Sequence, residues 1–154
     1  MAQPDSMARH VAGLQARGID TRAIALPRGR AERAAETFRE LASPNVVAGG
    51  HSFGGRAASL AAVEAAFAGL VLFGFPLAGK GEERTRHLDR IQCPVLILQG
   101  ESDALSPIDE LRRLLTRAPA IRLVTFPRAP HNLGAALPSA LDHAATFIHE
   151  LEGP

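Results

Sequence analysis

Apolar residues along the chain alternate between two kinds of spacing. In five segments they recur every three or four residues, which is typical of helices with one buried face. Between these segments lie short runs that are wholly apolar or alternate with polar residues, as strands do. The predicted helices span residues 6–17, 31–42 and 54–66, a segment that begins at Pro107, and residues 138–151. The predicted strands span residues 21–26, 46–49, 70–73, 94–98 and 123–126.

The alternation of strands and helices with short loops predicts an α/β fold with right-handed crossovers. The runs at 70–73 and 94–98 are continuously apolar, as strands are when helices cover both faces of a parallel sheet. The expected architecture is therefore three-layer α/β/α with a mostly parallel sheet of about five strands. With no internal repeat and no low-complexity linker, residues 1–154 are expected to form a single domain.

Composition narrows the classes of function. The chain is 46% hydrophobic and 21% charged, which excludes a disordered or fibrous protein. Its net charge of +1 gives no electrostatic reason to expect nucleic acid or an anionic membrane as a partner. The first residues lack the basic and apolar regions of a signal peptide, and no apolar stretch reaches the roughly 18 residues that span a bilayer. We therefore expect a soluble, cytoplasmic domain.

One short motif carries chemistry. Gly50-His51-Ser52-Phe53-Gly54 matches the pattern G-x-S-x-G, with an apolar strand before it and a helix after it. Ser52 would lie on a tight, strained turn, and a side chain at position 50 or 54 is expected to collide with that turn. The helix start would direct free N–H groups at a developing negative charge. An ordinary glycine-rich turn is the alternative, but the context favours Ser52 as a nucleophile.

A nucleophilic serine needs a general base, and that base needs an acid to orient it. Asp103 follows the apolar strand at 94–98 and lies better for this role than Glu101, although a simple turn aspartate is the alternative. His131 lies in the loop between the last strand and the last helix, and the other histidines lie within helices, in a polar connection or beside the serine. Because His51 is adjacent to Ser52 in a tight turn, we expect it to fill the strand end instead.

Three strings around these residues, GGHSFGGR, LVLFGFP and LILQGESD, resemble the α/β-hydrolase superfamily. More narrowly, they are similar to a small branch related to dienelactone hydrolases, which includes the hydrolase-like domains of a testis-expressed protein and of a non-specific-lethal chromatin complex subunit. The resemblance implies that Ser52, Asp103 and His131 form a catalytic triad and that the N–H of Phe53 is an oxyanion donor. It implies no metal and no organic cofactor.

The front of the chain departs from that family. The loop that normally supplies the second oxyanion N–H should end near residues 1–6, and an interior strand that normally lies between strands 21–26 and 46–50 is missing. Losing one oxyanion donor typically costs about 3–4 kcal/mol in the transition state. Either the two strands pair directly, or the gap is filled by residues upstream of Met1. An open gap predicts self-association at the sheet edge.

The resulting prediction is acyl transfer to water. Residues 74–91, where this fold commonly inserts a lid, form a short polar connection, so the site should be open. An open site favours a small soluble ester, thioester or lactone as the substrate. The alternative is an interaction module that keeps the fold and has lost turnover, which the resemblance to a chromatin-complex subunit makes plausible by analogy.

Overall fold

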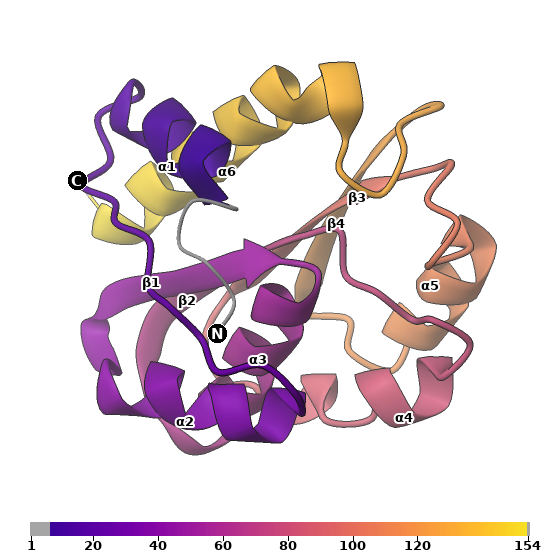
Figure 1. Cartoon of the computed structure of the whole chain (residues 1–154), viewed down its shortest axis with the longest axis horizontal. Coiled ribbons are helices and arrows are strands. Elements are labelled where there is room, and N and C mark those ends of the chain that lie inside the picture. The colour runs from indigo at the N-terminus through magenta and orange to yellow at the C-terminus, as the bar shows by residue number, and fades with distance from the viewer. Residues whose placement is uncertain (1–6, 154) are drawn as a thin grey trace.

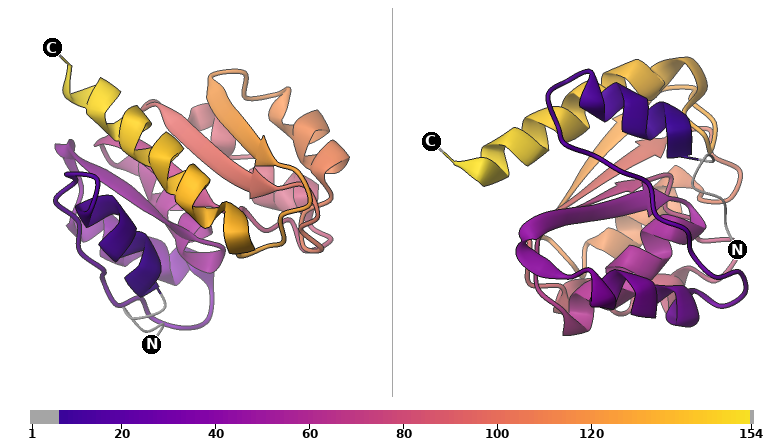
Figure 2. Two further views of the ribbon diagram at one scale, coloured as in Figure 1. Left: turned by 90° about the horizontal axis from the view of Figure 1, so that it is seen from above. Right: turned by 60° about the vertical axis from the view of Figure 1, so that its left-hand side comes forward.

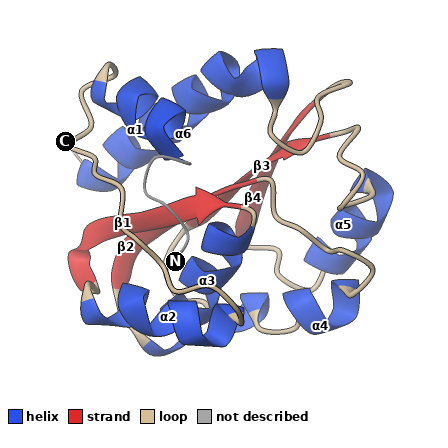
Figure 3. Cartoon of the chain, viewed as in Figure 1, coloured by secondary structure: helices blue, strands red, loops and turns tan. Residues whose placement is uncertain are grey.

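A computed structural model describes residues 7–153 of the chain. Its centre is a sheet of four parallel strands in the order β1-β2-β3-β4. Figure 1 shows these strands running side by side, and Figure 3 shows them as one layer between helices. The strands are β1 (Ser43–His51), β2 (Phe67–Phe73), β3 (Val95–Gly100) and β4 (Ile121–Phe126). The three-layer parallel architecture is confirmed, with four strands where the sequence predicted about five.

Helices cover both faces of the sheet (Figure 2). One face carries α1 (Ala8–Gln15) and α6 (Leu137–Glu152). The other face carries α2 (Ala31–Glu40), α3 (Phe53–Glu64) and α5 (Ile108–Leu115). Three short helices lie in the connections: α4 (Gly81–Thr85), η2 (Leu88–Arg90) and η3 (Gly134–Ala136).

Two apolar clusters, one on each side of the sheet, form the core. Because successive side chains of a strand point to opposite faces, Leu70 and Leu72 of β2 join the cluster under α2, α3 and α5. Val71 and Phe73 join the cluster under α1 and α6. The alanine-rich α3 packs closely as expected, since Ala57, Ala58 and Ala61 are fully buried.

The predicted strand at 21–26 is wrong. This segment is extended but outside the sheet, and only Leu26 makes an isolated bridge. The apolar alternation that suggested a strand is satisfied in another way, because Ile24 and Leu26 pack on the core cluster under α2 and α3. Pro27 then removes a donor N–H that a ladder would need. Direct pairing of this segment with residues 46–50 as a sheet strand, one of the two alternatives that the sequence left open, is therefore not present.

The connection at 74–91 is less polar than its sequence suggested. It folds into α4 and η2, and it buries Phe75, Leu77, His87 and Leu88. Within residues 7–153, no helix combines the length and apolar character needed to cross a bilayer.

Candidate active site

Ser52 lies at the sharp turn between β1 and α3. Its backbone has φ 55° and ψ −116°, a sparsely populated conformation for a residue with a side chain, and such strain typically costs about 1–3 kcal/mol. The Ser52 N–H donates to the carbonyl of Phe73 at 2.9 Å, which anchors the turn to β2. Although serine is a preferred helix-capping residue, its hydroxyl makes no capping hydrogen bond here. The hydroxyl is therefore free for another partner.

Only one of the two predicted glycine requirements at this turn holds. A Cβ at Gly50 would lie 2.6 Å from the carbonyl carbon of Gly54, so a side chain there collides with the turn as predicted. A Cβ at Gly54 would meet only Leu26, at an ordinary contact distance of 3.8 Å. The expectation of a collision at Gly54 is therefore wrong. The tighter second glycine is Gly55, where a Cβ would approach the Gly50 carbonyl oxygen to 3.2 Å.

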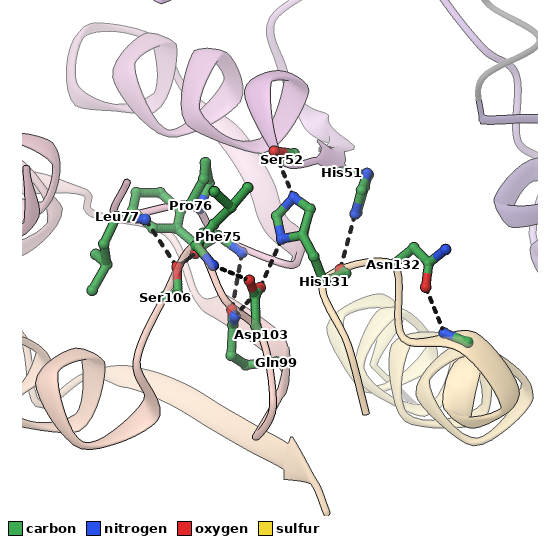
Figure 4. Close-up of polar contacts among 12 residues, drawn as sticks. His51, Ser52, Phe75, Pro76, Leu77, Gln99, Asp103, Ser106, His131 and Asn132 are labelled. Atoms are coloured by element: carbon green, nitrogen blue, oxygen red, sulfur yellow. Dashed lines mark hydrogen bonds and ion pairs between the residues drawn. The ribbon is translucent and has the colours of Figure 1, made fainter. Parts of the chain in front are cut away.

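The hydroxyl of Ser52 reaches His131, and His131 reaches Asp103 (Figure 4). Ser52 Oγ lies 2.9 Å from His131 Nε2, and His131 Nδ1 lies 2.7 Å from Asp103 Oδ2. Because an ionised carboxylate only accepts, Nδ1 carries the proton and Nε2 accepts from the serine hydroxyl. The Asp103 side chain is fully buried, whereas the His131 side chain is 24% exposed. We call these three residues the Ser52 cluster.

The loop that carries His131 is tightly held. Two of its non-glycine residues, Arg128 and Leu133, have positive φ angles of 61° and 67°. The Ser102 N–H donates to the Ala129 carbonyl at 2.9 Å, which joins this loop to the loop that carries Asp103. A Cβ at Gly100 would lie 2.3 Å from the same Ala129 oxygen, so the close approach of the two loops requires glycine there. The positions of Asp103 and His131 are thus fixed by the backbone around them.

His51 contacts His131, which the sequence argument missed. Its Nε2–H donates to the His131 carbonyl at 3.1 Å, and the two ring centroids lie 4.7 Å apart (Figure 4). Burial lowers the pKa of His51, and its hydrogen bond to the carbonyl partly opposes that shift.

His10 lies next to His51, with the two ring centroids 5.9 Å apart. Both ring nitrogens of His10 are buried without a hydrogen-bond partner among the described residues. Burial, followed by the nearby charges of His51 and Arg9, lowers the pKa of His10 to about 4.

A second serine–histidine contact lies farther along α3. Ser59 Oγ is 2.8 Å from His87 Nε2, and both residues are buried. The sequence argument placed His87 in a polar connection and missed this contact. Burial is the largest cause that lowers the pKa of His87 to about 4. Ser59 is fully buried, and no carboxylate of residues 7–153 makes a hydrogen bond to either side chain. We call these two residues the Ser59 pair and distinguish them from the Ser52 cluster.

The start of α3 offers one candidate donor for an oxyanion next to Ser52. Phe53 is the first residue of α3, where helix N–H groups have no acceptor within the helix. Its N–H therefore remains the candidate donor that the sequence indicated. The expected loop near residues 1–6, which bears on the second donor, lies outside the described residues. Across residues 7–153, no group of histidine, cysteine, aspartate and glutamate side chains is arranged to hold a metal ion.

Ser52, Asp103 and His131 come from three loops at the carboxyl edge of the parallel sheet, in that chain order. A parallel sheet with this order and geometry defines the α/β-hydrolase class of fold. The sequence agrees: residues 14–152 match the alpha/beta hydrolase domain family, and the chain belongs to it. No curated protein matches the chain significantly, so the narrower resemblance to testis-expressed and chromatin-complex domains stays a prediction.

Solved structures show the same fold. A monoacylglycerol lipase from Paleococcus ferrophilus superposes with a TM-score of 0.80 at 14% identity, over 97% of this chain and 91% of that one. A dienelactone hydrolase-like promiscuous phosphotriesterase from metagenomic libraries gives 0.58 at 20% identity, over 79% and 59%. A puromycin hydrolase gives 0.61 at 19% identity and covers 80% of this chain, which spans only 25% of that enzyme. At such identities the likeness establishes the fold alone.

Proposed function

We propose that this protein is a serine hydrolase that cleaves a small soluble ester, thioester or lactone through an acyl-enzyme on Ser52. The observation that carries the proposal is the continuous pair of hydrogen bonds in the Ser52 cluster, 2.9 Å from serine to histidine and 2.7 Å from histidine to aspartate. These distances match the reach that a nucleophile, its base and an orienting acid require.

In the first half of the reaction, Ser52 Oγ attacks the substrate carbonyl carbon and His131 Nε2 takes the hydroxyl proton. The buried carboxylate of Asp103 holds the imidazole in the required tautomer and stabilises the imidazolium that forms. When the tetrahedral intermediate collapses, the carbonyl carbon releases the alkoxide or thiolate, and His131 returns the proton to it. In the second half, His131 removes a proton from water as the water oxygen attacks the acyl carbon. The bond from that carbon to Ser52 Oγ then breaks, His131 returns the proton to Oγ, and the acid leaves.

Negative charge develops on the substrate oxygen during each attack. The N–H of Phe53 and the positive end of α3, a helix that begins directly after Ser52, would stabilise such charge. One preorganised donor of this kind is typically worth about 3–4 kcal/mol in the transition state. The rate of this chain therefore depends on how many donors reach the oxygen.

Exposure of the site and the names of the structural neighbours both support small-molecule hydrolysis. The His131 ring is partly open to solvent, so a small substrate can reach Ser52 without displacing the core. The neighbours include a lipase, a phosphotriesterase and a puromycin hydrolase, which agrees with hydrolysis as a class. The proposed range of substrates, a small ester, thioester or lactone, rests on the accessibility of Ser52 and His131 alone.

A fluorophosphonate probe tests this proposal directly. The probe phosphonylates an activated serine, so intact mass spectrometry should show one adduct on the wild type and a tryptic digest should place it on Ser52. Ser52→Ala should give no adduct, and Ser59→Ala should be labelled like the wild type. A folded wild type that stays unmodified at high probe concentration would overturn the enzyme proposal and favour the non-catalytic interaction module.

A further inference from the structure

Gln99 is a polar side chain in the middle of an apolar layer. It is the fifth residue of β3, a strand in which every residue is buried, and its own exposed fraction is 0%. Burying an amide without hydrogen bonds is unfavourable by several kcal/mol, so such a group is retained only where it has partners. Hydrophobic packing alone would favour another aliphatic residue at this position.

Both ends of the Gln99 amide have a partner (Figure 4). Its Oε1 accepts from the backbone N–H of Phe75 at 3.0 Å, and its Nε2 donates to Asp103 Oδ2 at 2.7 Å. A backbone N–H can only donate and an ionised carboxylate can only accept, so the orientation of the amide is fixed by its neighbours. Gln99 thus links the loop after β2 to the acid of the Ser52 cluster.

Asp103 has no solvent to stabilise its charge, since its side chain is fully buried. Three donors surround its carboxylate: Gln99 Nε2 and His131 Nδ1 at Oδ2, and the Leu105 N–H at Oδ1, 2.8 Å away. The Leu105 contact is local to the turn, whereas the Gln99 contact comes from a rigid strand. Hydrogen bonds to a charged acceptor are about twice as strong as neutral ones.

We propose that Gln99 is a positioning residue of the Ser52 cluster: it fixes the Asp103 carboxylate in the rotamer that faces His131 Nδ1. It touches neither substrate nor Ser52, and it acts through Asp103. This role rests on the proposed serine hydrolase function for its effect on rate, but the Gln99–Asp103–His131 contacts can be measured without turnover.

The first variant is Gln99→Met, which keeps the length of the side chain and removes both hydrogen bonds. We expect kcat for a short activated ester to fall about 10- to 100-fold, the range for losing a hydrogen bond to a charged group, with little change in KM. The matched control is Ser106→Ala. Ser106 is equally buried, and its hydroxyl binds the same loop through the Phe75 carbonyl and the Leu77 N–H. Only its backbone N–H contacts Asp103, by donating to the Asp103 carbonyl at 3.2 Å, and the substitution keeps that bond. Loosening the loop alone should leave kcat within a few-fold of the wild type.

The second variant, Gln99→Glu, preserves shape and makes the effect depend on pH. As a neutral acid, Glu at this position can still accept from Phe75 and donate its O–H to Asp103. Once that proton is lost, two buried carboxylates repel each other and the arrangement fails. We expect kcat/KM of Gln99→Glu to fall on the alkaline side, whereas the wild type and Ser106→Ala should show no such fall.

The proton between His131 Nδ1 and Asp103 Oδ2 should give a downfield proton NMR resonance, which can be recorded without substrate. It should shift or broaden in Gln99→Met and persist unchanged in Ser106→Ala. If the wild type neither hydrolyses esters nor reacts with fluorophosphonate, while this resonance still responds to Gln99→Met, the hydrolase function fails and the positioning role stands. The role is overturned if a folded Gln99→Met or Gln99→Glu keeps the wild-type resonance, or the wild-type rate and pH profile.

Discussion

The Ser52 cluster and the Ser59 pair offer two serine–histidine contacts in one molecule. Their hydrogen bonds are nearly equal, at 2.9 Å and 2.8 Å, and the two serines are two helical turns apart along α3, about 10 Å. The two contacts differ in burial and in the backbone conformation of the serine. Ser52 is partly exposed with a positive φ, whereas Ser59 is fully buried in regular helix.

The direction of the serine proton separates the two contacts. Ser59 Oγ donates its single proton to the Arg56 carbonyl at 2.7 Å, so His87 Nε2–H must be the donor in the contact between them. His87 therefore cannot act as a base toward Ser59. In the Ser52 cluster, Asp103 fixes the proton on His131 Nδ1, and Nε2 is left to accept from Ser52. A serine–histidine distance alone therefore does not identify a nucleophile.

The largest expected effect comes from removing the base. His131→Ala and Ser52→Ala should each lower kcat/KM for a short activated ester by at least about 1000-fold, because the members of a triad act as a unit. For the same reason, the double variant should be little worse than either single one. Steady-state kinetics on the purified proteins checks both statements.

The matched control for that experiment is His87→Asn, which removes the imidazole of the Ser59 pair. It should keep kcat/KM within about threefold of the wild type at a temperature where both are folded. Equal turnover by the wild type and Ser52→Ala would show that the activity belongs to a contaminant or to an adventitious surface group, and the comparison would then lose its functional meaning.

Sequence reasoning works best where local pattern and topology agree. The strands at 70–73 and 94–98 were predictable because short, continuously apolar runs are typical of parallel strands that helices cover on both faces. Ser52, Asp103 and His131 were found from their positions after strands, and the structure brings them within hydrogen-bond distance. Their catalytic role remains a prediction.

Contacts between distant segments are what the sequence does not show. The segment 21–26 alternates like a strand, but its apolar residues are satisfied by packing on the core rather than by pairing in the sheet. His87 lies among charged residues in sequence, and its burial depends on Ser59, 28 positions away. Gln99 had a usable signal, because a polar residue within a buried strand must find a partner. The sequence does not show that its partners are Asp103, four positions later, and the Phe75 N–H, 24 positions earlier.

The next largest effect is the dependence of the free energy of unfolding on pH, and it comes from the Ser59 pair. Burial lowers the pKa of His87 from 6.5 to about 4, so between these values the unfolded chain binds a proton that the folded chain does not. Stability therefore falls as the pH falls from about 6.5 to 4, by up to about 3 kcal/mol for this group. His10 acts in the same direction, with its pKa also lowered to about 4.

Urea unfolding of the wild type and of His87→Asn at several pH values isolates this contribution, since carboxylates titrate alike in both. The difference in unfolding free energy between the two proteins should shrink as the pH falls toward 4. A difference that is constant from pH 7 to pH 4 would mean that His87 is protonated in the folded protein, contrary to its burial.

A smaller effect tests the backbone around the Ser52 cluster. Gly74 and Gly79 both have positive φ angles, 63° and 74°, so alanine at either should cost about 1–2 kcal/mol of stability. A Cβ at Gly74 would also lie 2.7 Å from the His131 carbonyl oxygen, whereas a Cβ at Gly79 would meet nothing within 4 Å. We expect Gly74→Ala to lower kcat/KM about 10- to 100-fold and Gly79→Ala to leave it nearly unchanged. Similar rates for the two variants would show that the His131 loop tolerates displacement.

The smallest effect is expected from Ser59→Ala. Removing this hydroxyl leaves His87 Nε2–H buried without an acceptor, which should lower the free energy of unfolding by about 1–2 kcal/mol at pH 7. In the His87→Asn background the same change should cost less, and a double-mutant cycle by urea unfolding measures that coupling. Because the Ser59 hydroxyl donates to the Arg56 carbonyl of its own helix and Ser59 lies about 10 Å along α3 from Ser52, kcat/KM should stay within about twofold. A loss of activity as large as that of Ser52→Ala, in a protein that remains folded, would reverse the assignment of the two serines.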